Sequence, residues 1–348
     1  MNFLKKKILR LISYIVAKFV DLNISYLKKI NKNKLIAIDN FSFGDSWRFY
    51  IDKYYEIQNS DRKIIIFSIN DERVVEFFFQ KKDYSKILIL IPLKLSWIII
   101  ESLNKFKNFR SITSTHSRLK SYHFTKNQKK LIDYKLKKKK IYKKIKQLKK
   151  DNYITFFLKH YNDNSEDLSG SRSRQTSDLK KIFEIFQYLI SQKLKILILG
   201  NDLDLGTLLI KKLIKKKFKN KIIFFKEFSE KFSLADQIFA IKNSIGYVGS
   251  SASPSDVALS LNKKVLVFDR IYHDYRHPGL LKKGNIEEIY YDKKNKNLKM
   301  LYKRIQIKKS KPQILKYTTQ VKLTNKKFII IENNSKEIIS NIKKLFNF

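Results

Sequence analysis

A run of small hydroxyl residues that joins an expected strand to an expected helix is the strongest chemical signal in the sequence. The strand 244–248 ends at Gly249, and Pro254 lies near the first turn of the helix 254–262. A helix start offers N–H groups and the positive end of the helix dipole, which together with serine hydroxyls suit a diphosphate. A serine-rich helix cap is the alternative explanation of this pattern. The candidate ligand-binding residues are Ser250, Ser251, Ser253, Ser255 and Asp256.

Two cationic residues stand in loops that follow an expected strand. Lys159 comes directly after the strand 153–158, and Arg174 lies in the loop 165–177. An arginine at the carboxyl end of a strand can hold a diphosphate through parallel hydrogen bonds and neutralise a leaving group. Only 11 of the 75 basic residues are arginines, so an arginine here is less readily explained by composition than a lysine. A solvated basic loop is the alternative.

A carboxylate stands close behind the first expected strand. Asp45 follows Gly44 after the strand 35–38 and precedes a helix that begins near Trp47. A carboxylate in such a place can take a proton from an attacking hydroxyl, or it can cap the helix. Asp39 is a second candidate for the same role.

The segment 269–279 after the last strong strand gathers aspartates, arginines, histidines and tyrosines. His273 and His277 are four residues apart, a spacing that suits a metal ion on a helix. Pro278 makes that helix doubtful and no third ligand follows, so we predict no metal site. Asn201, at the end of another strand, is a candidate for contact with a base or ribose, and a simple turn is its alternative.

These residues need a sheet to bring them together, and the chain twice alternates apolar strands with helical segments. The expected strands are 35–38, 63–68 and 87–91 in the first half, and 153–158, 195–200, 222–225, 244–248 and 265–268 in the second. Such alternation predicts parallel sheets, whose ligands lie beyond the carboxyl ends of the strands. We therefore predict an α/β protein with two Rossmann-like domains facing a cleft.

The composition excludes several classes of protein. The chain has 348 residues and no cysteine, which excludes a disulfide framework and thiolate zinc sites. At 43% hydrophobic residues it is not a disordered basic tail. The net charge of +44 comes mainly from lysine, which shares A/T-rich codons with the abundant Ile, Asn, Phe and Tyr. The charge alone is therefore weak support for a nucleic-acid partner.

The first thirty residues combine a basic cluster, Lys5-Lys6-Lys7, with apolar residues at helical spacing on one face. The longest uncharged piece, 11–17, is far shorter than the ~20 residues that span a membrane. No small-residue cleavage site follows, so a signal peptide is not expected. Two alternatives remain open. The helix lies on an anionic membrane surface, or it packs on the protein's own core.

The stretch 247–268 resembles the nucleotide-sugar loop of GT-B glycosyltransferases. It is most similar to the heptosyltransferase-like group, whose loop reads Asp-Thr-Gly-x-Ser-His before a small-residue helix and a strand. Ser253 takes the glycine position and Asp256 the histidine position. The histidine contact is thus lost, and the acidic replacement does not suit an ADP-heptose donor. Ser250-Ser251 is also similar to the Ser-Ser loop of CDP-glycerol-type transferases and fucosyltransferases.

Two further segments carry the resemblance. Gly44-Asp45 is similar to the Gly-Asp of heptosyltransferases, which implies that Asp45 is the base for the acceptor hydroxyl. The segment from Arg174 to Asp178 resembles the Arg-Asn-x-Asp segment of some GT-B-like bacterial proteins. The loop after the last strand lies over the donor in GT-B proteins, which implies lid roles for Asp269, Arg270, His273 and His277.

The resemblance implies a bacterial, metal-independent glycosyltransferase of cell-envelope polysaccharide biosynthesis. It would move a sugar from a nucleotide-diphosphate donor to a cell-surface glycan or lipid-linked acceptor, with no cofactor and no specific nucleic acid. The expected location is the cytoplasm, with the inner membrane face as a candidate contact. The expected parts are an amphipathic helix (1–30), an acceptor domain (31–125), a basic connector (126–150), a donor domain (151–325), and a strand and helix that pack back (326–348).

Two alternatives from other functional classes stay open. The lysine-rich helix within 126–150 suits a nucleic-acid-binding protein, whose affinity would fall steeply with salt. The replaced donor-loop residues are compatible with a catalytically inactive GT-B-like protein that serves in surface polysaccharide assembly.

Overall fold

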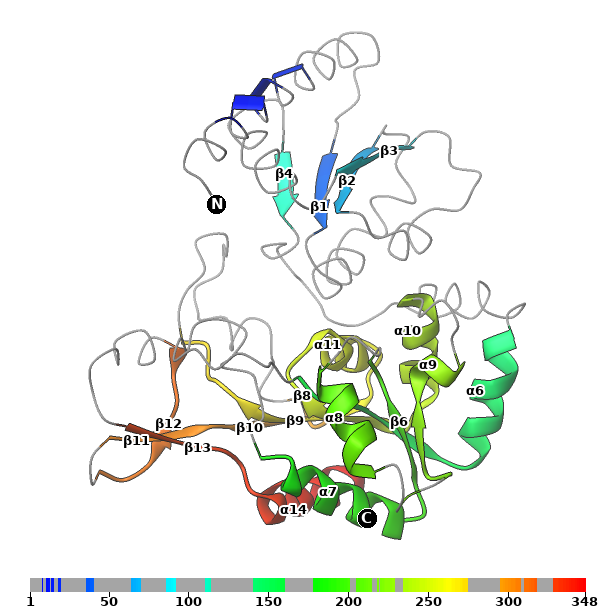
Figure 1. Cartoon of the computed structure of the whole chain (residues 1–348), viewed down its shortest axis with the longest axis vertical. Helices are drawn as coiled ribbons and strands as arrows, with labels where there is room; N and C mark the ends of the chain where they lie inside the picture. The colour runs from blue at the N-terminus through cyan, green and yellow to red at the C-terminus, as the bar shows by residue number, and fades with distance from the viewer. Residues whose placement is uncertain are drawn as a thin grey trace. The chain divides into compact units, whose positions relative to one another are not determined.

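The computed structural model describes the second half of the chain in detail and the first half in part (Figure 1). The residues described are 140–159, 178–200, 205–214, 218, 220–228, 234–274, 295–307, 310–317 and 328–348, the backbone of four strands within 36–113, and residues 8, 11, 12, 14, 15, 18 and 19. The chain divides into two compact units, Met1–Ser121 and Tyr122–Phe348.

The first unit contains a four-stranded parallel sheet in the order β3-β2-β1-β4. Its strands are β1 (Ile36–Asn40), β2 (Ile64–Ile69), β3 (Lys86–Ile91) and β4 (Arg110–Thr113). The first three are apolar runs without alternation, as expected of strands covered on both faces. The sequence predicted those three. It did not predict β4, whose four residues Arg-Ser-Ile-Thr lack an apolar run.

The second unit is built on a six-stranded parallel sheet in the order β10-β9-β8-β5-β6-β7. Counted from β5, this is the Rossmann order 3-2-1-4-5-6, with the order reversing between β5 and β8. The strands are β5 (Tyr153–Phe157), β6 (Lys195–Ile198), β7 (Ile222–Phe224), β8 (Gly246–Ser250), β9 (Lys264–Arg270) and β10 (Leu298–Tyr302). The predicted α/β class with Rossmann-like parallel sheets is confirmed.

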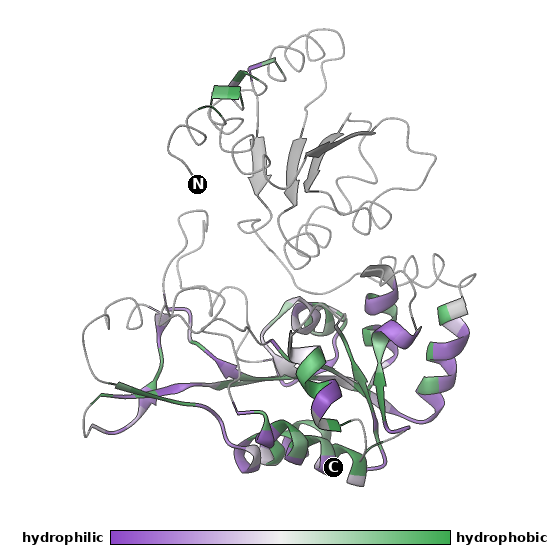
Figure 2. Cartoon of the chain, viewed as in Figure 1, coloured by the Kyte–Doolittle hydropathy of each residue, from purple (hydrophilic) through white to green (hydrophobic). Residues whose placement is uncertain are grey.

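Helices cover both faces of this sheet. In Figure 1, α7 (Lys180–Ser191) and α14 (Ser335–Phe346) lie together below it, and α10 (Leu234–Asn243) and α11 (Ser253–Ser260) lie above it. The remaining helices are α6 (Lys140–Lys150), α8 (Leu205–Ile214) and α9 (Phe225–Phe228). Phe156 of β5 meets Phe186 of α7 edge-on, with ring centroids 4.7 Å apart. The core between sheet and helices is therefore aromatic and aliphatic, as the inward green faces of Figure 2 show.

The carboxy-terminal segment joins this core. An antiparallel sheet in the order β12-β11-β13 follows β10, formed by β11 (Arg304–Ile307), β12 (Gln313–Ile314) and β13 (Phe328–Ile331). Helix α14 then packs on α7, β9 and β10. Ile338 and Ile342 are fully buried there.

The lysine-rich segment before β5 is partly a packed helix. Ile141, Ile145 and Leu148 of α6 are buried, and Tyr142 stacks on Phe239 of α10 with ring centroids 5.4 Å apart. The apolar face of α6 is thus occupied within the second unit, and its lysines lie on the other side.

The amino-terminal residues that the structure describes are helical. Their apolar side chains are exposed, with relative exposures between 46% and 67%; they are Ile8, Leu11, Ile12, Tyr14, Ile15 and Phe19. None of the helices in the described parts of the chain has the length and apolar character needed to cross a bilayer.

Candidate functional site

The carboxyl ends of β5 and β8 lie side by side where the strand order reverses, the place at which sheets of this kind bind ligands. The backbone N–H of Lys159 donates a hydrogen bond to Ser250 Oγ at 3.0 Å. A Cβ on Gly249 would lie 2.2 Å from the carbonyl oxygen of Phe157, and the φ of Gly249 is +154°. Glycine at 249 therefore permits the close approach of the two strand ends.

The start of α11 faces this strand end, and its serines have different roles. Ala252 is the N-cap in an extended conformation. The Ser255 hydroxyl accepts from the Ala252 N–H at 3.2 Å and donates to the Ala252 carbonyl at 2.5 Å. The hydrogen bonds of Ser255 are thus those of the helix-cap alternative. Ser253, one residue into the helix, is half-buried.

Arg270 brings a guanidinium to the loop. It ends β9, the strand next to β8, and its Nη1 donates to Ser251 Oγ. Arg270 and Ser251 are both buried, with relative exposures of 4% and 5%. Two segments that the sequence singled out separately, the serine loop and the polar segment after β9, therefore meet at the carboxyl edge of the sheet.

Tyr247 supports the end of β8 through its hydroxyl, and Asp256 is the charged residue that acts on it. The Tyr247 hydroxyl donates to the Ser250 carbonyl at 2.6 Å. Complete burial, and secondarily the negative charge of Asp256, raise the pKa of Tyr247 far above its usual 10.0, so the hydroxyl remains a donor. Asp256 is buried in the first turn of α11, where the helix dipole favours a carboxylate. This is the position that the resemblance matches to a histidine.

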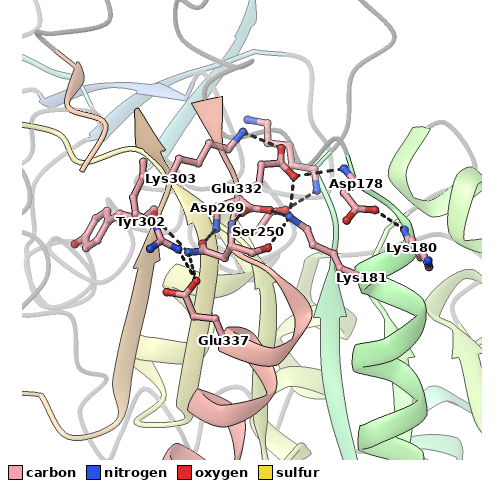
Figure 3. A network of polar contacts seen from close by, with 12 residues as sticks. Asp178, Lys180, Lys181, Ser250, Asp269, Tyr302, Lys303, Glu332 and Glu337 are labelled. Carbon is pink, nitrogen blue, oxygen red and sulfur yellow. Dashed lines mark hydrogen bonds and ion pairs between the residues drawn. The ribbon is translucent and has the colours of Figure 1, made fainter. Parts of the chain in front are cut away.

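Asp269 precedes Arg270 and belongs to a buried ion cluster (Figure 3). Its Oδ2 lies 2.5 Å from Lys181 Nζ, and the same ammonium lies 2.7 Å from Glu332 Oε2. Lys303 Nζ lies 3.2 Å from Glu332 Oε1. Burial and the charge of Glu332 raise the pKa of Asp269 above 3.8, although the Lys181 ammonium and a backbone hydrogen bond from Asn333 oppose this shift.

His273 is buried beyond this cluster and stacks on Tyr317 with ring centroids 5.7 Å apart. Nowhere in the described ranges do three or more metal-binding side chains come together.

A different feature lies at the opposite edge of the sheet, where a cavity of about 610 Å³ opens beside the amino ends of β5, β8 and β9. Its lining includes four lysines: Lys149, Lys242, Lys263 and Lys264.

Several predicted residues fall outside those that the structure describes, namely Asp45, Arg174, Asn201 and His277. Asp39 lies on the described backbone of β1, paired with Phe67 of β2 and Thr113 of β4. Lys159, Ser250, Ser251, Ser253, Ser255, Asp256, Arg270 and His273 are described at or near the carboxyl edge of the second sheet, and the Asp269 side chain lies in the ion cluster behind it.

The sequence did not single out the residues that support Arg270. The sequence holds one sign that Lys181 is buried. It lies at four-residue spacing with Ile185 and Leu189, which form the buried face of α7. A charged residue within an apolar stripe requires a buried partner. Asn333 and Glu332 carry no such signal, since they lie some 150 positions away and meet Lys181 only through the fold.

Comparison with solved structures shows a shared fold. A family 9 glycosyl transferase from Veillonella parvula is similar to this chain with a TM-score of 0.50 and 11% identity, over 90% of this chain and 97% of the other. The ADP-heptose LPS heptosyltransferase II of E. coli gives a TM-score of 0.45 and 7% identity, over 90% and 98% of the two chains. No protein-family model and no curated protein matches the sequence. The chain shares the α/β fold of the Veillonella parvula glycosyl transferase.

Proposed function

We propose that this protein is a glycosyltransferase that binds the diphosphate of a nucleotide-sugar at the carboxyl end of β8. One observation carries the proposal: the buried Arg270 guanidinium meets Ser251 directly before the start of α11, at the strand reversal where such sheets bind ligands. A fixed positive charge, a hydroxyl and a helix start are a combination that suits a diphosphate.

The same groups would act on the reaction itself. Cleavage of the sugar–diphosphate bond leaves negative charge on the leaving oxygen, and positive groups already in place stabilise that charge as it develops. Arg270 supplies one such group. Lys159, whose backbone is joined to Ser250, and Arg174 are proposed as further cations around the diphosphate. Because side chains and a helix dipole provide this charge, we propose a transfer that needs no metal ion.

The acceptor side is assigned to the first unit. We propose that the Asp45 carboxylate takes the proton from the attacking hydroxyl of a glycan or lipid-linked acceptor, while the diphosphate leaves from the opposite face of the sugar. Asp45→Asn removes the basic oxygen at almost constant size. Turnover should fall by a factor of about 100 or more, the usual range for general-base catalysis. Unchanged turnover in the folded variant would exclude Asp45 as the base.

The donor can be identified by direct binding. Thermal-shift measurements with ADP-, GDP-, UDP-, CDP- and CMP-sugars should give one selective increase in the melting temperature. Ser251→Ala should reduce that increase, whereas Lys299→Ala, an exposed change on β10 of the same sheet, should not. If no nucleotide-sugar binds, the catalytically inactive alternative is favoured. Tight, salt-dependent binding of RNA or DNA instead would favour the nucleic-acid alternative.

We further infer that the amino-terminal helix holds the protein on an anionic membrane surface. Its exposed apolar side chains, among them Leu11, Ile15 and Phe19, occur together with the basic residues Lys5-Lys6-Lys7, Arg10 and Lys18. Apolar residues enter the headgroup boundary while lysines contact anionic lipid. Wild-type protein should sediment with phosphatidylglycerol vesicles and not with phosphatidylcholine vesicles. Leu11→Glu/Ile15→Glu should abolish this binding; full retention would contradict the inference.

A further inference from the structure

Arg270 follows an irregular step in β9. The pairing with β10 runs from Met300–Val267 directly to Tyr302–Arg270, so β9 has one residue more than its partner over this step. Asp269, within this bulge, has a φ of 53°. A left-handed conformation is uncommon for residues other than glycine, although aspartate tolerates it better than most. A left-handed conformation of this kind persists only where surrounding contacts stabilise it. Residues in such conformations, and β-bulges, are often found at functional sites.

Hydrogen bonds stabilise the bulge at both Asp269 and Arg270. The Asp269 N–H donates to Asn333 Oδ1 at 2.9 Å, and the Asn333 N–H donates back to Asp269 Oδ1 at 2.8 Å. The Lys303 N–H donates to the Arg270 carbonyl at 2.8 Å. The backbone of the bulge is thus held by the Asn333 side chain, from the turn before α14, and by Lys303, the residue that directly follows β10.

The side chains around the bulge form a balanced set. Lys181 and Lys303 supply two positive charges, and Asp269 and Glu332 supply two negative charges, all linked as Figure 3 shows. They come from α7, from the residue between β10 and β11, from the end of β9 and from the turn before α14. Lys181, Asp269 and Asn333 are almost completely buried. We call Lys181, Asp269, Lys303, Glu332 and Asn333 the bulge cluster.

The bulge changes where Arg270 points. Side chains two residues apart in a regular strand share one face of the sheet. Phe268 packs against Phe156 in the core, and Lys181 of α7 lies 6.0 Å from its ring. In a regular strand Arg270 would share that face with Phe268. It instead reaches Ser251, the residue directly after β8, which an extra residue in β9 permits.

We propose that the bulge cluster is a positioning device that directs the Arg270 guanidinium to the diphosphate site beside Ser251. This inference rests on the proposed function, since it assumes that Arg270 binds the diphosphate. Its positioning residues are Asn333 and Asp269, which act through Arg270 and need not touch the ligand. The cluster also links the carboxy-terminal segment to the donor loop, because Glu332 and Asn333 belong to the turn between β13 and α14.

A double-mutant cycle tests the inference, with binding of inorganic pyrophosphate measured by calorimetry on the full-length protein. Arg270→Ala should weaken binding about 10- to 100-fold, the range for loss of a charge-assisted hydrogen bond. Asn333→Ala should weaken it about 3- to 10-fold, a fraction of that loss. In the Arg270→Ala background, Asn333→Ala should have no further effect, because there is no guanidinium left to position.

Variants at Asp269 provide a second route that does not depend on the folding of Asn333→Ala. Asp269→Asn keeps an acceptor for the Asn333 N–H and a residue that tolerates the left-handed conformation, so it should bind pyrophosphate better than Asp269→Ala. Asp151→Asn, which breaks an exposed pair with Lys195 at the far edge of the sheet, is the matched control and should bind as the wild type does.

The outcomes separate the inference from the proposed function. Independent, multiplicative losses for Asn333→Ala and Arg270→Ala would overturn the positioning role and leave the diphosphate site in place. Equal binding by Asp269→Ala and Asp269→Asn would also overturn it. If Arg270→Ala binds pyrophosphate as the wild type does, or if the wild type does not bind it, the diphosphate site itself is refuted and the inference with it.

Discussion

Lys181→Met removes a buried cation that contacts two carboxylates, so the structure predicts a large electrostatic effect. The ammonium lies 2.5 Å from Asp269 Oδ2 and 2.7 Å from Glu332 Oε2, and it donates to the Asn333 carbonyl at 3.1 Å. Methionine fills similar space without charge. Glu332 keeps Lys303 at 3.2 Å, but Asp269 loses its cation while fully buried. Removing one partner of a buried pair costs about 3–5 kcal/mol, which we expect as the loss in unfolding free energy at pH 7.5.

The loss should depend on pH in a defined direction. The pKa of Asp269 is already raised above 3.8 by burial and by Glu332, and loss of the opposing cation raises it further. The folded variant therefore gains stability as its carboxyl takes up a proton. The deficit relative to the wild type should shrink at acid pH, by at most about 1.4 kcal/mol per pH unit.

The assay must report on the second unit. Trp47 and Trp97 are the two tryptophans, and both belong to the first unit, so tryptophan fluorescence would follow the wrong part of the chain. Hydrogen exchange of peptides that cover β5 and β9, measured by mass spectrometry against urea concentration, is the appropriate probe.

Two further variants complete this test. Lys181→Met/Asp269→Asn should recover much of the stability, because the buried charge that lost its cation is also removed. Lys195→Met, which breaks a pair exposed by 27% and 46%, should cost no more than about 1 kcal/mol. A Lys181→Met loss below that of Lys195→Met, or a double variant less stable than Lys181→Met, would refute the reasoning.

Three further effects are expected within the second unit. Gly249→Ala should lower the unfolding free energy by about 2–5 kcal/mol, because its Cβ would lie 2.2 Å from the Phe157 carbonyl oxygen at a φ that strains alanine; a change below 0.5 kcal/mol in urea unfolding would contradict this. Tyr247→Phe leaves the buried Ser250 carbonyl without its 2.6 Å donor and should cost about 1–2 kcal/mol by the same measurement. The raised pKa of Asp269 means that its carboxyl favours the folded state when protonated, so stability falls as pH rises from about 3.8 through the raised value; Asp269→Asn should lack this decline in a comparison of unfolding at pH 4 and pH 7.

The fold followed from local patterns wherever those patterns were strong. Short, β-branched apolar runs such as Ile64-Ile65-Ile66 and Leu197-Ile198 are typical of strands in a sheet covered on both faces, and they predicted strands correctly. The polar strand β4 was missed, and so was β10, where Lys299 and Tyr302 interrupt the apolar residues. Their strand conformation comes from pairing with β1 and β9, which is a property of the sheet.

The site was predictable in its parts but not in its connections. The serine loop before α11 and the polar residues after β9 were visible because each follows a strong strand. That Arg270 reaches Ser251 depends on the bulge at Asp269, and the bulge depends on Asn333, which is 64 positions further along the chain. No local pattern contains such a link. The roles of Asp45 and Arg174, and the nucleic-acid alternative for the basic helix, stay predictions.

The position of a bound nucleotide is the most direct test of the proposed function. A crystal structure with the nucleoside diphosphate that binds tightest should place phosphate oxygens within hydrogen-bonding distance of Ser251 Oγ and the Arg270 guanidinium, in front of the start of α11. The opposite edge of the same sheet offers a contrasting location, the cavity with Lys149, Lys242, Lys263 and Lys264 in its lining. A nucleotide bound there, with the carboxyl end of β8 unoccupied, would contradict the proposed donor site.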